Sequence, residues 1–331
     1  MVAVLAAMGL DQPALDTPVT ADSPLDDIYA HLLEAEAGFA ALGGLLSTQT
    51  PVPDGVEART EVITGSDGND ISLYIHTPPG HSADQPVPAV VHTHGGGMVM
   101  LQAADAGYVR YRTELAAMGL VVIGVEFRNG GGALGNHPFP AGLNDCASAA
   151  KWVIENKAAL GVSKVITSGE SGGGNLSIAT AMRAKAEGWV DEIAGVYAQC
   201  PYVYGDYGTP NPALASMVEN DGYFIGIANM GALSKAYDPD GSNATNPEAW
   251  PYHATADDVA GLPPHIISVN QLDPLRDEGL AFYRTLLAGG VSAMSRTVNG
   301  TGHAGDCLFI DAMPEVFQAT MRDIKSFADS L

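Results

Sequence analysis

The chain has 331 residues, of which 46% are hydrophobic, so it can bury a large core as a soluble domain. Its formal net charge of -23 argues against nucleic acid and anionic membranes as partners, because phosphate binding needs clustered Lys and Arg. This acidity fits either an ordinary acidic enzyme or a surface adapted to salt, where screening relieves the repulsion between like charges.

The first 50 residues are helical in character. The opening stretch MVAVLAAMGLDQP is apolar but lacks the basic segment of a signal peptide, so we expect a cytoplasmic protein. It is also shorter than the roughly 18 residues that a membrane span requires. A helix is predicted to follow, with Ser23 as its cap, Pro24 at its first position and Gly43 at its end.

Strands and helices alternate along most of the remaining chain. Residues 56–65 and 70–78, joined by SDGN, have the pattern of a β-hairpin. Further strands are predicted at residues 88–94, 120–127, 163–169, 192–199, 265–270 and 292–298. Helices are predicted at residues 105–119, 140–160, 173–187, 276–288 and 314–331. Continuous apolar strands separated by helices predict an α/β fold: a mostly parallel sheet of about eight strands, covered on both faces, with the hairpin at one edge.

Residues 201–262 interrupt this alternation. They are rich in Pro, Gly, Asn and Tyr, with short helical pieces at 213–219 and 229–237. We expect this insertion and the N-terminal helices to form a cap over the carboxyl edge of the sheet, where open α/β sheets bind ligands. The expected division is a cap of residues 1–50 and 201–262 and a core of residues 51–200 and 263–331.

The stretch VITSGESGGGN places Ser171 between a strand and a helix. This is the context of a nucleophile elbow, in which a sharp turn lifts the serine above the sheet and points a helix N-terminus at it. With 39 glycines in the chain, the G-x-S-x-G pattern is not specific by itself. A P-loop would end in Lys-Ser/Thr, and a Rossmann loop would open the first βα unit, so both alternatives fit less well.

A nucleophilic serine needs a base and an acid that orients the base. In hydrolases with this elbow the order along the chain is Ser, then Asp or Glu, then His. Asp273 follows one predicted strand and His303 follows the next, so both belong at the same sheet edge as Ser171. Asp277 and Glu278 are rivals for the acid, but they fall in the first turn of a helix, where acids are common for other reasons.

The stretch HTHGGGM follows the strand of residues 88–94 and matches the loop that forms an oxyanion hole. Its predicted donors are the N–H groups of Gly96 and Gly97, joined by that of Gly172 after the nucleophile. His92 and His94 could instead be read as metal ligands, but no third ligand is spaced nearby. We expect no metal and no organic cofactor, and we expect His94 to bond to the backbone and shape the loop.

The chain has three cysteines: Cys146, Cys200 and Cys307. Their odd number and their spacing favour neither a disulfide framework nor a zinc site. We expect small buried side chains in a reducing compartment.

At HGGG, GESGGGN, DPLRDEG and the histidine at 303, the sequence resembles the bacterial hormone-sensitive-lipase family of α/β hydrolases. The resemblance implies that Ser171 is the nucleophile, His303 the base and Asp273 its orienting acid. It also implies a serine carboxylesterase acting on small-molecule esters with short chains of about two to eight carbons. A homodimer formed through the last strand or helix is implied by the resemblance alone.

Two departures from that family stand out. Most members have GDSAGG where this chain has Glu170 and Gly172, and the role of Glu170 stays open. The family's DYRLAPE is here EFRNGGG, where we expect Arg128 and Asp145 to be structural.

The cap should determine substrate choice. Five aromatic residues there line a substrate pocket or serve as ordinary cap packing: Tyr202, Tyr204, Tyr207, Tyr223 and Phe224. Lactone or amide hydrolysis on the same triad remains an alternative reaction. A non-catalytic receptor of this fold would have lost its base, so His303 favours an enzyme. An epoxide hydrolase would usually carry Asp in place of Ser171.

Overall fold

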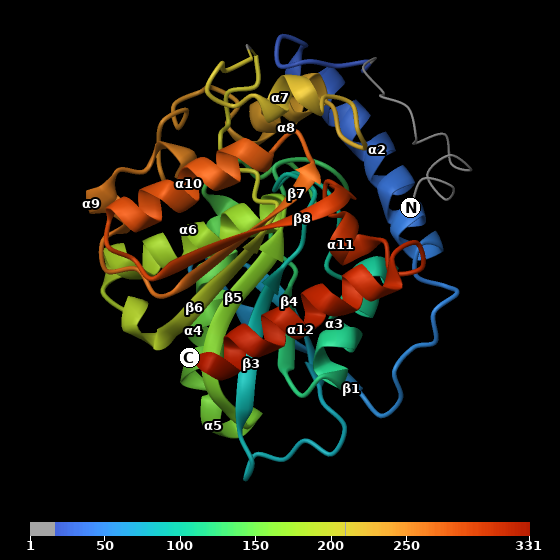
Figure 1. Cartoon of the computed structure of the whole chain (residues 1–331), viewed down its shortest axis with the longest axis vertical. Helices are drawn as coiled ribbons and strands as arrows, with labels where there is room; N and C mark the ends of the chain where they lie inside the picture. The colour runs from blue at the N-terminus through green and yellow to red at the C-terminus, as the bar shows by residue number, and fades with distance from the viewer. Residues whose placement is uncertain (1–16, 209) are drawn as a thin grey trace.

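The computed structural model describes residues 17–208 and 210–331, and the stretch that bears on a signal peptide lies outside them. Its centre is an eight-stranded sheet in the order β1-β2-β4-β3-β5-β6-β7-β8 (Figure 1). The strands are β1 Glu57–Thr64, β2 Asp70–Thr77, β3 Val87–Thr93, β4 Val121–Val125, β5 Val162–Glu170, β6 Ile193–Gln199, β7 His265–Leu272 and β8 Ala293–Gly302. The predicted α/β fold is confirmed.

The predicted hairpin lies at one edge of this sheet. β1 and β2 pair antiparallel, and Thr64 faces Asp70 across the turn. Gly68 in that turn has a φ of 80°, a conformation that glycine adopts without steric cost. β2 also pairs antiparallel with β4, whereas every later pairing is parallel. The carboxyl ends of β3 to β8 therefore meet at one edge of the sheet.

Helices cover both faces of the sheet because the central strands are apolar on both sides. Val90 and Ile166 pack against α3 (Ala106–Ala117) and α12 (Pro314–Ser330). Val91 and Val165, on the opposite face, pack towards α4 (Ala141–Glu155) and α6 (Gly172–Glu187). α10, at Arg276–Ala288, covers the same face near β7.

The helix boundaries differ from the sequence predictions in two of the longer helices. α2 runs from Leu25 to Leu45, so Pro24 is the cap and not the first helical residue, and the Ser23 hydroxyl accepts from the Thr20 N–H. The helix expected at 140–160 is two helices, because it breaks at Asn156 before α5. The structure also contains short helical turns: α5 Lys157–Leu160, η1 Val190–Glu192, η2 Pro251–His253, α9 Ala256–Val259 and α11 Gly305–Leu308.

Helices from the two sequence segments of the expected cap, residues 1–50 and 201–262, lie together beyond the carboxyl edge of the sheet (Figure 1). α2 packs against α8, Ile227–Tyr237, and against α3 of the core. The His31 ring bonds to the Asn229 side chain at 3.3 Å, which joins α2 to α8. α7 covers Ser216–Glu219, so it begins three residues later than the helical piece predicted at 213–219. Across the described residues, each helix is too short or too polar to span a bilayer.

Glu278 attaches the insertion to α10. Its buried carboxyl group accepts from the Val203 N–H at 2.7 Å and from the Tyr204 N–H at 3.2 Å. The Tyr207 hydroxyl donates to both of its oxygens. Burial raises the pKa of Glu278 to about 8, although these hydrogen bonds act in the opposite direction.

Replacing Glu278 by glutamine should change how stability depends on pH. The folded-state pKa of Glu278 lies above its ordinary value of 4.5, so its contribution to stability is present below pH 4.5 and is lost as pH rises through about 8. Urea unfolding of the wild type should therefore show a loss of stability between about pH 4.5 and 8 that Glu278→Gln reduces. Glu278→Ala should lose about 2–4 kcal/mol at pH 6, because three donors lose their acceptor. An identical pH dependence in wild type and Glu278→Gln would contradict this assignment.

Candidate active site

Ser171 lies at a strained turn between β5 and α6. Its φ of 57° and ψ of -121° are unfavourable for a residue with a side chain, and such strain costs on the order of 1–3 kcal/mol. The turn is held by the Ser171 N–H, which donates to the Gln199 carbonyl at 2.9 Å. The Ser171 carbonyl accepts in turn from the N–H groups of Asn175 and Tyr202. The elbow predicted from the sequence is therefore present.

The glycines around Ser171 are required by close backbone contacts. A Cβ at Gly173 would lie 1.9 Å from the Thr93 carbonyl oxygen, and one at Gly169 would lie 2.2 Å from the same atom. Both separations are far below any real contact, so a side chain at either position would move β3 away from the elbow. The elbow and the loop after β3 are thereby held together.

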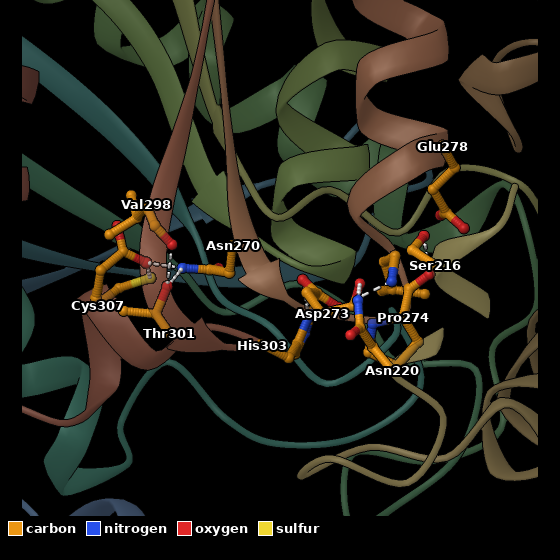
Figure 2. Close-up of polar contacts among 12 residues, drawn as sticks. Ser216, Asn220, Asn270, Asp273, Pro274, Glu278, Val298, Thr301, His303 and Cys307 are labelled. Atoms are coloured by element: carbon orange, nitrogen blue, oxygen red, sulfur yellow. Dashed lines mark hydrogen bonds and ion pairs between the residues drawn. The ribbon is translucent and has the colours of Figure 1, made fainter. Parts of the chain in front are cut away.

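Asp273 and His303 meet because of the strand register. β7 and β8 are parallel neighbours in which Leu272 faces Gly302, so the next residue of each strand is Asp273 and His303. The His303 Nδ1 atom lies 2.9 Å from Asp273 Oδ2, and Figure 2 shows the two side chains together. The other carboxylate oxygen accepts from the Leu275 N–H at 2.9 Å, which fixes the orientation of the acid.

The two rival acids have other partners. Asp277 forms an ion pair with Arg276 and accepts from the Ser216 N–H, whereas Glu278 attaches the insertion to α10. Among the described residues, only Asp273 forms an ion pair with His303. Sequence reasoning missed Asn220, whose side-chain amide donates to the Asp273 carbonyl at 3.1 Å and braces the acid loop from the insertion (Figure 2).

The electrostatics around His303 favour its protonated form. Burial alone would lower the pKa of His303, but the charge and the hydrogen bond of Asp273, together with the adjacent Cys200, outweigh burial and raise it well above the ordinary value of 6.5. Because a catalytic base must be neutral to accept a proton, the ring becomes competent only as pH rises.

We expect kcat/KM for ester hydrolysis to fall about tenfold per pH unit on the acid side, with the apparent pKa of that limb above 6.5. Asp273→Asn should move this limb to lower pH, because the charge that stabilises the imidazolium is removed, and should lower kcat by about 10⁴. A pH profile from 5 to 10 on both proteins measures this. A wild-type limb at or below the ordinary histidine pKa would show that Asp273 does not act on His303 in this way.

The predicted oxyanion loop lies against the residue that follows Ser171. Gly96 and Gly97 have φ angles of 95° and 63°, which favour glycine. A Cβ at Gly172 would lie 2.8 Å from the Gly97 nitrogen and 2.6 Å from the Met98 nitrogen. In the part of the chain that the structure describes, no protein group accepts from the Gly96 or Gly97 N–H.

Glu170, whose role the sequence left open, holds this loop in place. Its buried carboxylate accepts from the Gly95 N–H at 2.6 Å and lies 3.3 Å from His92 Nε2. Burial and the charge of Glu170 raise the pKa of the neighbouring Tyr108 hydroxyl. Burial lowers the pKa of His92, so the ring is neutral and can donate to the carboxylate. Glu170 is the residue immediately before the nucleophile, and its side chain thus holds the oxyanion loop against the elbow.

Other residues singled out in the sequence have structural partners. The His94 Nδ1 atom lies 2.8 Å from the Gly95 carbonyl and its ring stacks on Phe127, as expected for a residue that shapes the loop. Arg128 forms two hydrogen bonds with Asp145, at 2.9 Å each. The three cysteine thiols are free and buried.

Ser171 and His303 open into one cleft of about 520 Å³. Gly96, Gly97 and Glu170 line the same cleft, so the nucleophile, the base and the oxyanion loop share one space. Its other walls are mostly apolar and come from α2, the oxyanion loop, the insertion and α11: Phe39, Met100, Leu101, Phe224, Ile225, Met230, Leu233 and Leu308. Apolar side chains on the predicted cap helices were the only sequence signal for these residues.

The aromatic residues of the insertion divide into two groups. Phe224 lies on the wall of the cleft. Tyr202 is fully buried below it, where its hydroxyl bonds to Ser234 and its ring stacks on Tyr207. Tyr223 is 39% exposed and is not among the residues that line the cleft. Tyr204 packs edge to face on Tyr252. Only Phe224 therefore has the position expected of a substrate contact.

Comparison with known proteins agrees with this site. Residues 90–305 match a family model described as the alpha/beta hydrolase fold. The carboxylesterase NlhH of Mycobacterium tuberculosis is 29% identical over 329 residues, covering 95% of this chain and 98% of that protein.

Solved structures agree as well. Brefeldin A esterase, a bacterial homologue of human hormone-sensitive lipase, is 45% identical and superposes with a TM-score of 0.96 over 99% of this chain and 92% of its own. Esterase Est22 is 36% identical, with a TM-score of 0.88 over 99% of this chain and 95% of its own. The chain therefore belongs to the alpha/beta hydrolase family, in the branch of the bacterial homologues of hormone-sensitive lipase.

Proposed function

We propose that the protein is a carboxylesterase that hydrolyses short-chain esters through an acyl-enzyme intermediate. The observation that carries this proposal is that the strained Ser171 and the His303–Asp273 pair meet at one apolar cleft. The named esterases among its relatives support the same reaction.

In the proposed reaction His303 accepts the proton of the Ser171 hydroxyl as its oxygen attacks the ester carbonyl carbon. The tetrahedral intermediate collapses, His303 returns the proton to the leaving alcohol, and Ser171 carries the acyl group. Water, activated by the same ring, then attacks the acyl carbon and releases the carboxylic acid. Asp273 holds the Nδ1 side of the ring and stabilises the imidazolium in both halves of the reaction.

The N–H groups of Gly96, Gly97 and Gly172 are proposed to stabilise the negative charge that develops on the carbonyl oxygen. The first two are unpaired within the described residues, and the third begins α6, whose N-terminus carries partial positive charge. Losing one such donor typically raises the barrier by about 2.7–4 kcal/mol.

The walls of the cleft support a substrate with small apolar groups. A second apolar space of about 430 Å³ adjoins it and shares Phe39 and Phe224 with it. The rings of these two residues meet edge to face with centroids 6.0 Å apart where the two spaces adjoin, and we propose that they form the partition between them. Without movement of this aromatic pair, we propose that only short acyl or alcohol groups fit beside Ser171.

A panel of nitrophenyl esters of increasing acyl length, with lactones and anilides in the same assay, tests this proposal. We expect turnover to be highest for short acyl chains of about two to eight carbons. An organophosphate should inactivate the enzyme and leave its adduct on the peptide that contains Ser171. Hydrolysis of long acyl chains or anilides alone, or an adduct on another serine, would contradict the proposal.

We further propose that α2 and residues 201–262 act together as the cap, that the enzyme is cytoplasmic, and that it forms a homodimer. The packing of α2 on α8 supports the first of these. β8 supports the last, since it is an edge strand with Met294 61% exposed. Sedimentation of the wild type and of Met294→Lys measures the dimer, and a wild-type monomer would contradict it.

A further inference from the structure

The thiol of Cys200 lies against the acid and base of the proposed triad. Gln199 at the end of β6 pairs with Glu170 at the end of β5, so the next residues, Cys200 and Ser171, stand side by side at the sheet edge. One ligand atom each of Cys200, Asp273 and His303 lies within 4.8 Å of the others.

These three side chains form a donor set that suits a thiophilic divalent cation. Thiolate, imidazole and carboxylate are the ligands that Zn²⁺ takes in proteins, at about 2.3 Å for sulfur and 2.0–2.2 Å for nitrogen and oxygen. Tetrahedral bonds of those lengths separate neighbouring ligand atoms by about 3.2–3.6 Å. The present separation of 2.9 Å between His303 Nδ1 and Asp273 Oδ2 would therefore widen by only a few tenths of an ångström as a cation replaced the shared proton.

The access route also suits a cation. The three groups are at least 95% buried, yet His303 lines the cleft that opens to Ser171, which provides an entrance. Three protein ligands would leave a fourth position for water.

We propose that Cys200, Asp273 and His303 form an inhibitory site for Zn²⁺ and other thiophilic divalent cations. The cation takes the place of the proton between Nδ1 of His303 and Asp273 and displaces their hydrogen bond. The ring then loses the carboxylate that orients it and stabilises the imidazolium, so it stops acting as a base, and a chelator that removes the cation restores it. The cation site rests on the geometry of the three residues, whereas its effect on turnover rests on the proposed function.

Cys307 is a neighbour of this site and not a member of it. Its thiol donates to Asp306 Oδ1 at 3.7 Å, and Figure 2 shows it beside Asn270 and Thr301, apart from the Asp273–His303 pair. Cys146 is a buried free thiol on α4, away from the triad. The two residues therefore serve as a near and a distant control.

The test measures hydrolysis of p-nitrophenyl acetate against buffered free Zn²⁺ and Cd²⁺, with each variant compared to its own metal-free rate. Wild type should lose activity and regain it with EDTA. Cys200→Ser, or Cys200→Ala should the serine variant fold poorly, should need at least about tenfold more Cd²⁺, because the soft ligand is gone. Cys146→Ser and Cys307→Ser should keep the wild-type sensitivity, and Mg²⁺ should not inhibit.

A second readout does not depend on turnover. Cd²⁺ should give a thiolate charge-transfer band in the ultraviolet with wild type and with Ser171→Ala, and the band should be lost in Cys200→Ala. If the protein shows this band but hydrolyses no ester, the cation site stands and the proposed function fails. Equal Cd²⁺ sensitivity in wild type and Cys200→Ser would overturn the proposal. An equal loss of Cd²⁺ sensitivity in Cys200→Ser and Cys307→Ser would also overturn it, because that result would place the cation between the two thiols.

Discussion

Ser171→Ala is expected to lower kcat for p-nitrophenyl acetate by about 10⁴ to 10⁶, because no other group can form the acyl-enzyme. The fold should survive the change, since alanine meets the same backbone strain at φ 57° as serine does. Stopped-flow and long steady-state assays on purified protein measure the rate, and thermal unfolding measures the fold. A variant that keeps more than about one hundredth of wild-type turnover would exclude Ser171 as the nucleophile.

Two further variants separate chemistry from structure. Ser171→Gly should be as inactive as the alanine variant, yet more stable by about 1 kcal/mol, because glycine adopts this backbone conformation without strain. Ser177→Ala is the matched control on the same helix. Its buried hydroxyl bonds to Thr93 Oγ1 at 2.8 Å, so its loss should lower stability and leave kcat within about threefold of wild type.

Sequence patterns could predict the fold because each central strand contains a run of apolar residues, as in Val121–Val125. The same patterns predicted the order of Ser171, Asp273 and His303, since strand ends are visible as the points where apolar runs stop. In the structure, the strand register brings the predicted acid and base together. Leu272 faces Gly302, so Asp273 and His303 follow as neighbours. Cys200 lies beside Ser171 for the same reason, but a cysteine after a strand has no distinguishing pattern in one sequence.

What the sequence could not predict depends on side chains that meet from distant segments. Phe39 of α2 and Phe224 of the insertion form one wall of the cleft, and no periodicity in either segment reveals the other. Tyr202 and Phe224 look alike as aromatic residues of the insertion, yet only one faces the cleft. The sequence prediction placed the N-cap residue of α2 one position early, at Ser23, because serine and proline are both common at helix starts.

Glu170 and Gly172, the two departures from the GDSAGG pattern of relatives, act on the same loop. The longer side chain of glutamate reaches the Gly95 N–H at 2.6 Å and draws the oxyanion loop onto the elbow. With the loop this close, a Cβ at position 172 would lie 2.6 Å from the Met98 nitrogen. We infer that glutamate at 170 and glycine at 172 are a matched pair.

Gly172→Ala should therefore lower kcat by about 10²-fold or more, because the new methyl group pushes the Gly97 N–H away from the oxyanion. Glu170→Asp should lower kcat about tenfold, since its carboxylate no longer reaches the Gly95 N–H. In the double variant the loop is free to move away from the methyl group. Its kcat should exceed that of Gly172→Ala alone, although each change is harmful by itself.

Gly174→Ala is the control for this coupling. Its Cβ would meet the Gln199 carbonyl at 3.0 Å and Pro201 at 3.1 Å, on the side of the glycine run away from the oxyanion loop. Any loss that it causes should add to that of Glu170→Asp and should not be rescued by it. Full activity in Gly172→Ala, or strictly additive losses in the Glu170→Asp/Gly172→Ala double variant, would show that the two departures are independent. Such a rescue would show that the Glu170 side chain sets the spacing of the oxyanion hole without touching the reacting atoms of the substrate.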